Sequence, residues 1–415
     1  MKRKLCLFST LLTLMVLLGA GQALSAGYCP NDDVDLYPFG WSTGGAKGTE
    51  DFDKNGDGTF NGDPDIICMD IAAGDGFVNM ADSTALYIFG FSKVPFGMPE
   101  NQIVDSQTLK QGTPAPTIVL KEGQEFYLNL SNVGMMMRPD LSDPHSVHYH
   151  GFPNAAPVFD GLPEAGPTIK MFNTYTYYYK NVEPGTYFYH CHVEATEHIQ
   201  MGMIGNLWVL PAQDGTDFEY PPASGKHYTR FAYNDGDGST GYDVAFAIQL
   251  TAFDSNFHKL HLGVQPLPFA DLDDDYHMLN GRGYPDTINP GELGDSPDNN
   301  SYPSQKMNAR IEATSGQKIL LRLSGVQTVH PSTVTVLGIP MQVVGIGARI
   351  LRGPDNKNLY YNTSAITVGG GQGYDVLLDT TGVTPGTYFF YATNPETLVN
   401  GTEERGGAMT EIVIN

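Results

Sequence analysis

A short stretch between residues 190 and 203, HCHVEATEHIQMGM, constrains this chain more than any other. It places a thiol, Cys191, close to an imidazole at His198 and a thioether at Met203. Two imidazoles and one thiolate in a trigonal set, with a weak axial Met, are the ligands of a blue copper centre. One imidazole must then come from another strand, and His145 is the natural donor.

Four further histidines flank these candidate ligands as two His-x-His pairs. His148 and His150 form one pair, and His190 and His192 enclose Cys191 as the other. Side chains at i and i+2 of a β-strand point to the same side, so each pair can present two imidazoles to a second metal site. A lone histidine is more often a hydrogen-bonded core residue than a ligand. Here six of the eleven histidines fall in two short windows. A single thiolate with an available Met favours copper over structural zinc, which uses two or more thiolates or a compact Cys/His quartet.

These motifs resemble those of the multicopper oxidases, which are built from cupredoxin domains. The phrases PAPTI (114–118), PGTYFY (184–189) and NGRGYP (280–285) support the resemblance, which covers roughly residues 84 to 415. It implies an all-β fold of two cupredoxin-like Greek-key β-sandwich domains. One departure is the spacing before the last type 1 histidine, which is five residues here and three in the family. The resemblance implies that His145, Cys191, His198 and Met203 are type 1 copper ligands, His148 a type 2 ligand, and His150, His190 and His192 type 3 ligands.

Length and composition fit this architecture. A chain of 415 residues suggests about two or three domains. Its 48 Gly and 28 Pro, together with many aromatic residues, favour an all-β chain rich in turns. The formal net charge of −23 argues against nucleic acid and against anionic membrane surfaces as partners.

The N-terminus predicts export. A positively charged start, an apolar run and small residues mark residues 1–26 as a signal peptide. No later stretch is long and apolar enough to cross a bilayer, so we expect a secreted or periplasmic protein without a membrane span. Cys6 leaves with the signal and Cys191 is a metal candidate. In an oxidising compartment the remaining pair, Cys29 and Cys68, is predicted to form a disulfide.

Residues 27–83 are rich in Gly and Asp and form a predicted N-terminal extension. Within it, Asp53, Asn55 and Asp57 match the opening of a calcium-binding loop, but the acidic residue expected at the twelfth position is missing. A second fragment, residues 75–82, looks like the later half of such a loop. A plain Asx-turn loop explains these residues equally well. Calcium, if bound, would be structural.

The rest of the chain divides into two repeats. Residues 84–212 form the predicted copper-binding domain, 213–227 a linker rich in Gly, Asp, Pro and Ser, and 228–415 a second cupredoxin-like domain. The phrase PGTYFY returns as PGTYFF at 385–390. Strands of the first domain are predicted at 86–91, 117–120, 125–130, 175–179, 186–190 and 206–210.

The ligands do not return in the second repeat. Tyr391, Ala392 and Thr393 stand where the first repeat has its His-Cys-His motif. We also expect His330, Thr333 and Thr335 to take the places of His145, His148 and His150. The second domain is therefore predicted to lack a copper site of its own.

The resemblance implies a copper-dependent oxidoreductase. A small molecule, a metal ion or a redox protein would donate electrons to the type 1 copper, and a type 2/type 3 site would reduce dioxygen. The family's full trinuclear cluster takes eight histidines, and this chain offers four beside Cys191. We therefore expect either a homo-oligomer that pools histidines or a smaller second site. The alternatives are a copper nitrite reductase-like enzyme and a non-enzymatic copper-binding or electron-transfer protein.

Overall fold

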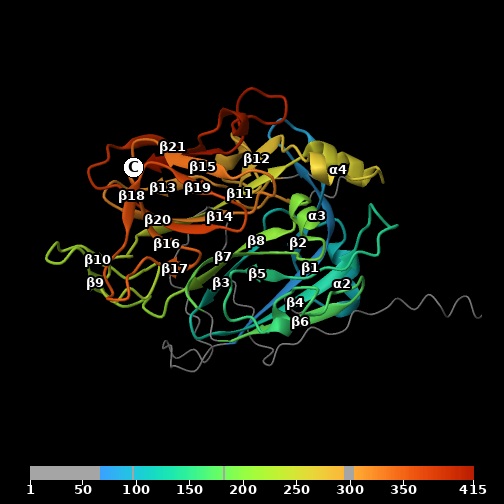
Figure 1. Ribbon diagram of the computed structural model, residues 1–415, viewed down its shortest axis with the longest axis horizontal. Coiled ribbons are helices and arrows are strands. Elements are labelled where there is room, and N and C mark those ends of the chain that lie inside the picture. The colour runs from blue at the N-terminus through green and yellow to red at the C-terminus, as the bar shows by residue number, and fades with distance from the viewer. Residues whose placement is uncertain (1–65, 96–97, 181–182, 294–302) are drawn as a thin grey trace, which may run out of the picture.

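Both sequence repeats fold as pairs of β-sheets, and the two sandwiches pack against each other in the computed structural model (Figure 1). The structure describes residues 66–95, 98–180, 183–293 and 303–415. No helix in these ranges is long and apolar enough to cross a membrane. The predicted signal peptide lies outside them. The all-β prediction is confirmed.

The first sandwich contains two four-stranded sheets, in the orders β2-β1-β4-β6 and β3-β8-β7-β5. Aromatic and aliphatic side chains fill the core between the sheets. Strands β2, β7 and β8 are buried along almost their whole length, so both of their faces are covered. All six strands predicted for this domain are present. Their bounds are β1 Ile66–Asn79, β2 Ala85–Lys93, β3 Ala115–Lys121, β4 Glu125–Gly134, β5 His148–His150, β6 Thr174–Tyr179, β7 Gly185–His190 and β8 Ile204–Leu210.

The first sandwich begins before residue 84, inside the segment predicted as an extension. Strand β1 pairs with both β2 and β4 and is therefore a central strand. Asp75, which the sequence suggested as part of a calcium loop, is buried there and accepts hydrogen bonds from the hydroxyl of Tyr87 and the amides of Met136 and Met137. The Gly and Asp content of this strand hid its apolar pattern.

The second sandwich contains a seven-stranded and a five-stranded sheet. Its core is built from Ile, Val and Leu side chains of both sheets. A short hairpin, β9 (Phe218–Glu219) and β10 (His227–Tyr228), occupies the predicted linker. The strand bounds are β11 Val244–Phe253, β12 Tyr276–Leu279, β13 Ile311–Ala313, β14 Lys318–Gly325, β15 Ser332–Val336, β16 Met341–Ile346, β17 Arg349–Ile350, β18 Tyr361–Thr363, β19 Ile366–Val368, β20 Gly373–Asp379, β21 Gly386–Ala392 and β22 Met409–Ile414.

The helices are short and lie between strands. Two of them, α3 and α4, are neighbours beside the first sandwich (Figure 1). The helix bounds are α2 Glu100–Gln107, α3 Ala195–Gln200, α4 Ser255–Leu262, η2 Pro157–Phe159, η3 Phe269–Asp271, η4 Asp286–Ile288 and η5 Pro395–Thr397.

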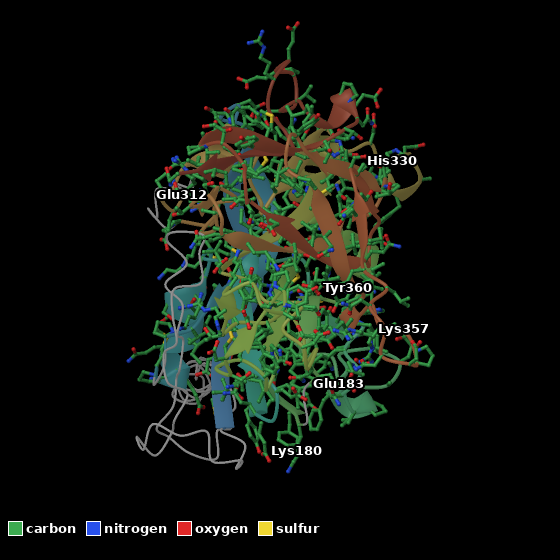
Figure 2. The ribbon with its side chains drawn as sticks, turned by 90° about the vertical axis from the view of Figure 1, so that its left-hand side faces the viewer. Lys180, Glu183, Glu312, His330, Lys357 and Tyr360 are labelled. Carbon is green, nitrogen blue, oxygen red and sulfur yellow. The ribbon has the colours of Figure 1, made fainter. Side chains whose placement is uncertain are left out.

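A buried polar network joins the two sandwiches. Arg322 of β14 donates to the hydroxyl of Thr186 on β7, which in turn donates to Asp375 of β20. The Arg322 guanidinium also lies over the ring of Trp208, 5.0 Å from its centroid. At the surface, an ion pair between Glu183 and Arg349 connects the same two domains; Glu183 is labelled in Figure 2. In the buried network, the charges of Arg322 and Asp375 lie 3.5 Å apart and so pair with each other at the contact between the domains.

Candidate metal centre

The two His-x-His pairs meet because their strands pair. Strands β5 and β7 are antiparallel, with His148 opposite His190 and His150 opposite Phe188. Residues two apart on a strand share a face, so His148 and His150 lie on the same side of this sheet. The chain then turns at Cys191, whose side chain enters the core of the sandwich and is fully buried. Adjacent residues thus serve opposite sides of the sheet.

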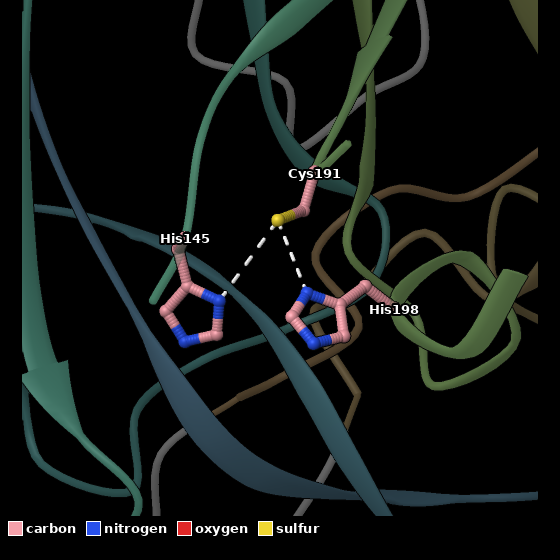
Figure 3. A group of neighbouring side chains, drawn as sticks. All are labelled: His145, Cys191 and His198. Carbon is pink, nitrogen blue, oxygen red and sulfur yellow. Dashed lines mark hydrogen bonds between the residues drawn. The ribbon is translucent and has the colours of Figure 1, made fainter. Parts of the chain in front are cut away.

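The first group of donors consists of His145, Cys191 and His198. The ligand atoms of these three side chains lie within 4.8 Å of one another. The Cys191 Sγ is 3.1 Å from Nδ1 of His198 and 3.9 Å from Nδ1 of His145 (Figure 3). All three side chains are completely buried, and Nε2 of His145 has no hydrogen-bond partner. The Nδ1 atoms of both rings face the sulfur, and this triad has the donor set of a copper or zinc ion.

Electrostatics favour a thiolate at Cys191. Burial alone would raise the pKa of this thiol, but the positive charge and hydrogen bond of His198, together with His145, lower it to about 5. The pKa of His198 is raised in turn by the Cys191 thiolate and by Asp143, although burial opposes that shift. Metal binding requires a thiolate and neutral imidazoles, so a metal would displace the proton that Cys191 and His198 share.

The longer spacing between Cys191 and His198 is accommodated by a helix. Glu194 adopts a left-handed conformation, with φ of 47°, and α3 starts at the next residue. The helix returns His198 toward Cys191 despite the additional residues. Two backbone hydrogen bonds join the ends of this loop. The Met203 N–H donates to the His198 carbonyl at 2.9 Å, and the Cys191 N–H donates to the Met203 carbonyl at 3.2 Å.

Methionine donors line the same core. Met201 and Met203 are both fully buried in the core of the first sandwich, which also contains Cys191. Gly202 between them has φ of +111°, a conformation that side chains other than glycine rarely adopt. This turn places both neighbours in the core, and Met203 stays the proposed axial ligand.

Asp143 is a functional candidate that the sequence reading missed. Its Oδ2 lies 3.2 Å from Nε2 of His198, and its side chain is only 9% exposed. Carboxylates in this position fix the tautomer and orientation of a metal-binding histidine. The exposed Glu194 also brings a ligand atom within 4.8 Å of those of Asp143 and His198. Asp143 stands two residues before His145, which is the only sequence signal that could have indicated it.

The second group of donors consists of His148, His150 and His190, whose ligand atoms lie within 4.8 Å of one another. The ring of His192 is 5.0 Å from that of His148 and 5.5 Å from that of His190, measured between centroids. All four predicted histidines are therefore neighbours. Burial lowers the pKa of His150 and lowers that of His190 to about 3, which keeps both rings neutral at pH 7. Neutral rings are what metal binding requires.

Hydrogen bonds orient two of these rings. Nδ1 of His148 lies 2.7 Å from the carbonyl oxygen of Asp160, and Nδ1 of His190 lies 2.8 Å from the carbonyl oxygen of Cys191. Each Nδ1 must carry the proton, because a carbonyl oxygen can only accept. This leaves Nε2 of each ring available to a metal. The bond from His190 also connects the two donor groups through the backbone of Cys191.

The second domain approaches this group without supplying ligands. A Cβ at Gly371 would lie 3.1 Å from Nε2 of His150, so any other residue at this position would crowd that ring. In the described part of the second domain, no three His, Cys, Asp or Glu side chains form a comparable group. His330 lies exposed on that domain (Figure 2).

The strand register corrects the predicted equivalence between the repeats. Thr335 pairs with Tyr391, just as His148 pairs with His190. Tyr391 and His190 stand at the same distance after the PGTYF phrase of their repeats, so they are equivalent. Thr335, and not Thr333, therefore occupies the place of His148. The hydroxyl of Thr335 donates to the backbone carbonyl of Ser364.

Some predicted sites cannot be placed. The calcium candidates Asp53, Asn55 and Asp57 lie outside the described residues, as does Cys29. Cys68 is disulfide-bonded. Cys191 is the free cysteine among the residues that the structure describes.

Comparison with known proteins identifies the family of this chain. Two sequence families, both described as multicopper oxidase, match residues 97–214 and 258–411. Together they cover more than half of the chain, so this protein belongs to the multicopper oxidase family.

Among characterised relatives, Multicopper oxidase MCE from Talaromyces pinophilus is 27% identical over 151 residues, which is 36% of this chain and 23% of the relative. Copper resistance protein A from Escherichia coli is 31% identical over 116 residues, which is 28% of this chain and 17% of the relative. The aligned parts thus span about a fifth of these relatives' length.

Solved structures cover most of the chain at lower identity. The blue copper oxidase from Nitrosomonas europaea superposes with a TM-score of 0.59 at 22% identity, covering 84% of this chain and 86% of that one. The copper nitrite reductase from the same organism superposes with a TM-score of 0.55 at 15% identity, covering 84% and 94%. At these identities the likeness establishes the two-domain fold.

Proposed function

We propose that the protein is a copper-dependent oxidoreductase that passes electrons from a reduced donor to dioxygen. His145, Cys191 and His198, with Met203 as axial ligand, would hold a type 1 copper. His148, His150, His190 and His192 would hold the type 2/type 3 copper site. When bound, copper supplies one-electron chemistry at the first site and reduction of dioxygen at the second.

One observation carries this proposal: Cys191 belongs to the first donor group, its chain neighbour His190 belongs to the second, and the ring of its other neighbour, His192, lies beside that second group. The residues themselves therefore join the two sites. The hydrogen bond from His190 Nδ1 to the Cys191 carbonyl, at 2.8 Å, adds a second connection parallel to the covalent one. Asp160 and Asp143 would orient His148 and His198 for ligation.

The test is copper analysis combined with visible absorption and oxygen uptake. We expect an intense thiolate-to-copper band that disappears in Cys191→Ser, and oxygen uptake with an added reductant. A copper-loaded protein without that band would refute the type 1 assignment. Oxygen uptake unchanged in His150→Ala would refute the role of the second group.

A second candidate is a non-enzymatic copper-binding or electron-transfer protein. It is favoured by the second domain, which offers no donor group among its described residues, so that the eight histidines of a full family cluster are not all supplied by one copy. In that case His150→Ala would leave electron transfer unchanged. A nitrite reductase-like enzyme would instead show nitrite-dependent turnover.

We further propose that the chain is secreted or periplasmic, on the strength of its signal-like N-terminus. Association of several copies would supply further ligands to the second site. A structural calcium at Asp53, Asn55 and Asp57 and a disulfide between Cys29 and Cys68 complete the proposal. Metal analysis that counts copper and calcium per chain tests the cofactors, and sedimentation tests the association.

A further inference from the structure

Helix α4 belongs to the second domain by sequence but packs against the first. It lies between β11 and β12 of the second sandwich, yet it contacts β2 of the first and lies beside α3 (Figure 1). Phe257 on α4 is fully buried in the same apolar core as Cys191 and Met203. Through this helix, the second domain reaches the candidate type 1 ligands.

Two buried histidines on α4 contact α3, the helix that carries His198. His258 and His261 are three residues apart and therefore share one helical face. Nδ1 of His258 lies 2.6 Å from the carbonyl oxygen of Tyr87, and its Nε2 lies 3.0 Å from the carbonyl oxygen of Gln200, the last residue of α3. A neutral ring has one N–H and donates to one of these two carbonyls. Nε2 of His261 lies 2.7 Å from Oε1 of Glu197, directly before His198. The second domain thus contacts α3 in its middle, at Glu197, and at its last residue, Gln200.

The bonds of His261 have a fixed direction. Nη1 of Arg138 lies 2.9 Å from Nδ1 of His261. A guanidinium can only donate, so Nδ1 must accept, and a neutral ring then carries its proton on Nε2 and donates it to Glu197. Arg138 is itself anchored by an ion pair with Asp140 at 2.7 Å. The chain of donors runs from Arg138 through His261 to Glu197.

Packing provides a second connection. The ring of Phe89 meets the ring of His261 edge-on at 4.7 Å between centroids, and it meets the ring of His198 edge-on at 5.6 Å. Phe89 therefore lies between the α4 histidine and the candidate copper ligand. A displacement of His261 would reach His198 through Phe89 as well as through Glu197.

We propose that α4 is a clamp on the type 1 loop and that His261 is its positioning residue. A helix as short as α3 is not stable by itself, so its position depends on tertiary contacts. The two additional residues between Cys191 and His198 lengthen the loop, and His261 holds its helix where His198 Nδ1 lies 3.1 Å from the Cys191 sulfur. The inference rests on the proposed type 1 site.

Two substitutions separate the two bonds of His261. The Gln amide in His261→Gln reaches the position of Nε2 and can still donate to Glu197. The Asn amide in His261→Asn reaches the position of Nδ1 and retains only the contact with Arg138. We expect His261→Asn to weaken copper binding about tenfold, as loss of outer-sphere support does elsewhere, and to shift the thiolate-to-copper band. His261→Gln should keep the wild-type band and affinity.

Glu197→Leu removes the same bond from the other side and should reproduce His261→Asn. If the bond is the cause, the double variant should lose no more affinity than either single one. Asn256→Ala alters an exposed position of the same helix and should leave band and affinity unchanged. If His261→Asn does not fold, Glu197→Leu tests the same bond with the same readouts.

The outcomes are distinct. A lower melting temperature in His261→Asn and Glu197→Leu, with wild-type band and copper affinity, would show a merely structural contact and overturn the clamp. Wild-type protein that lacks the band altogether would instead overturn the proposed type 1 site. A band that moves in both variants and returns in His261→Gln would support the positioning role.

Discussion

Asp143 offers the sharpest test of how the protein environment supports the first donor group. Its carboxylate lies 3.2 Å from Nε2 of His198, and the two side chains are 9% and 0% exposed. Asp143→Asn keeps the size and an accepting oxygen but removes the charge. Loss of a carboxylate behind a metal-binding histidine costs about 10- to 100-fold in metal affinity, or about 1.4 to 2.8 kcal/mol.

The assay is competition for copper with a chelator of known affinity, with the thiolate-to-copper band reporting occupancy. Glu194→Gln is the matched control, because it removes an equal charge from an exposed side chain near the same histidine. Water screens that charge, so its effect should be smaller. Copper affinity unchanged in Asp143→Asn, or weakened more in Glu194→Gln, would refute the reasoning.

The same carboxylate predicts a pH dependence. Burial alone would raise the pKa of Asp143, but its bond with His198 holds the pKa below the ordinary value of 3.8. A lowered pKa means that Asp143 stabilises the fold fully above its ordinary value, and that this contribution is lost as the pH falls through the folded-state pKa. The unfolding free energies of wild type and Asp143→Asn should therefore converge in acid.

Two further predictions concern the second donor group. Burial lowers the pKa of His190 from the ordinary 6.5 to about 3 in the folded protein, so metal-free protein should lose stability as the pH falls from 6.5 toward 3. His190→Gln should remove at most about 1.4 kcal/mol per pH unit from this pH dependence of the unfolding free energy, measured by urea unfolding. Gly371 has φ of +88° and faces His150, so Gly371→Ala should cost about 1 to 2 kcal/mol of stability from the backbone alone. It should also reduce oxygen uptake and leave the thiolate-to-copper band in place. Gly382 has φ of +77° and no atom near an added Cβ, so Gly382→Ala is the control and should affect stability only.

The sequence predicted the strands that carry strong periodic signals. The aromatic alternation of residues 175–179 and the PGTYFY phrase correspond to β6 and β7, and the His-x-His spacing placed His148 and His150 on one face. These features are local, because a strand's own side-chain pattern determines them. The all-β fold and the family assignment are accordingly confirmed.

The features that the sequence did not reveal depend on tertiary contacts. Strand β1 contains Asp75, and its buried carboxylate accepts hydrogen bonds from the backbone amides of a distant loop. No local sequence pattern indicates these partners. No local pattern indicates that α4 brings His261 from the second domain to Glu197. Only the strand register shows that Thr335, two residues after Thr333, is the equivalent of His148. In the sequence alone, a threonine at either position matches the repeat equally well.

The central claim is that the Cys191 sulfur binds copper together with His145 and His198. The most direct measurement is the visible and electron paramagnetic resonance spectrum of copper-loaded wild-type protein beside Cys191→Ser. The account predicts an intense sulfur-to-copper absorption in the wild type and its complete loss in Cys191→Ser, with copper still retained by the second donor group. A wild type that holds copper without this absorption, or an absorption that survives the loss of the sulfur, would contradict it.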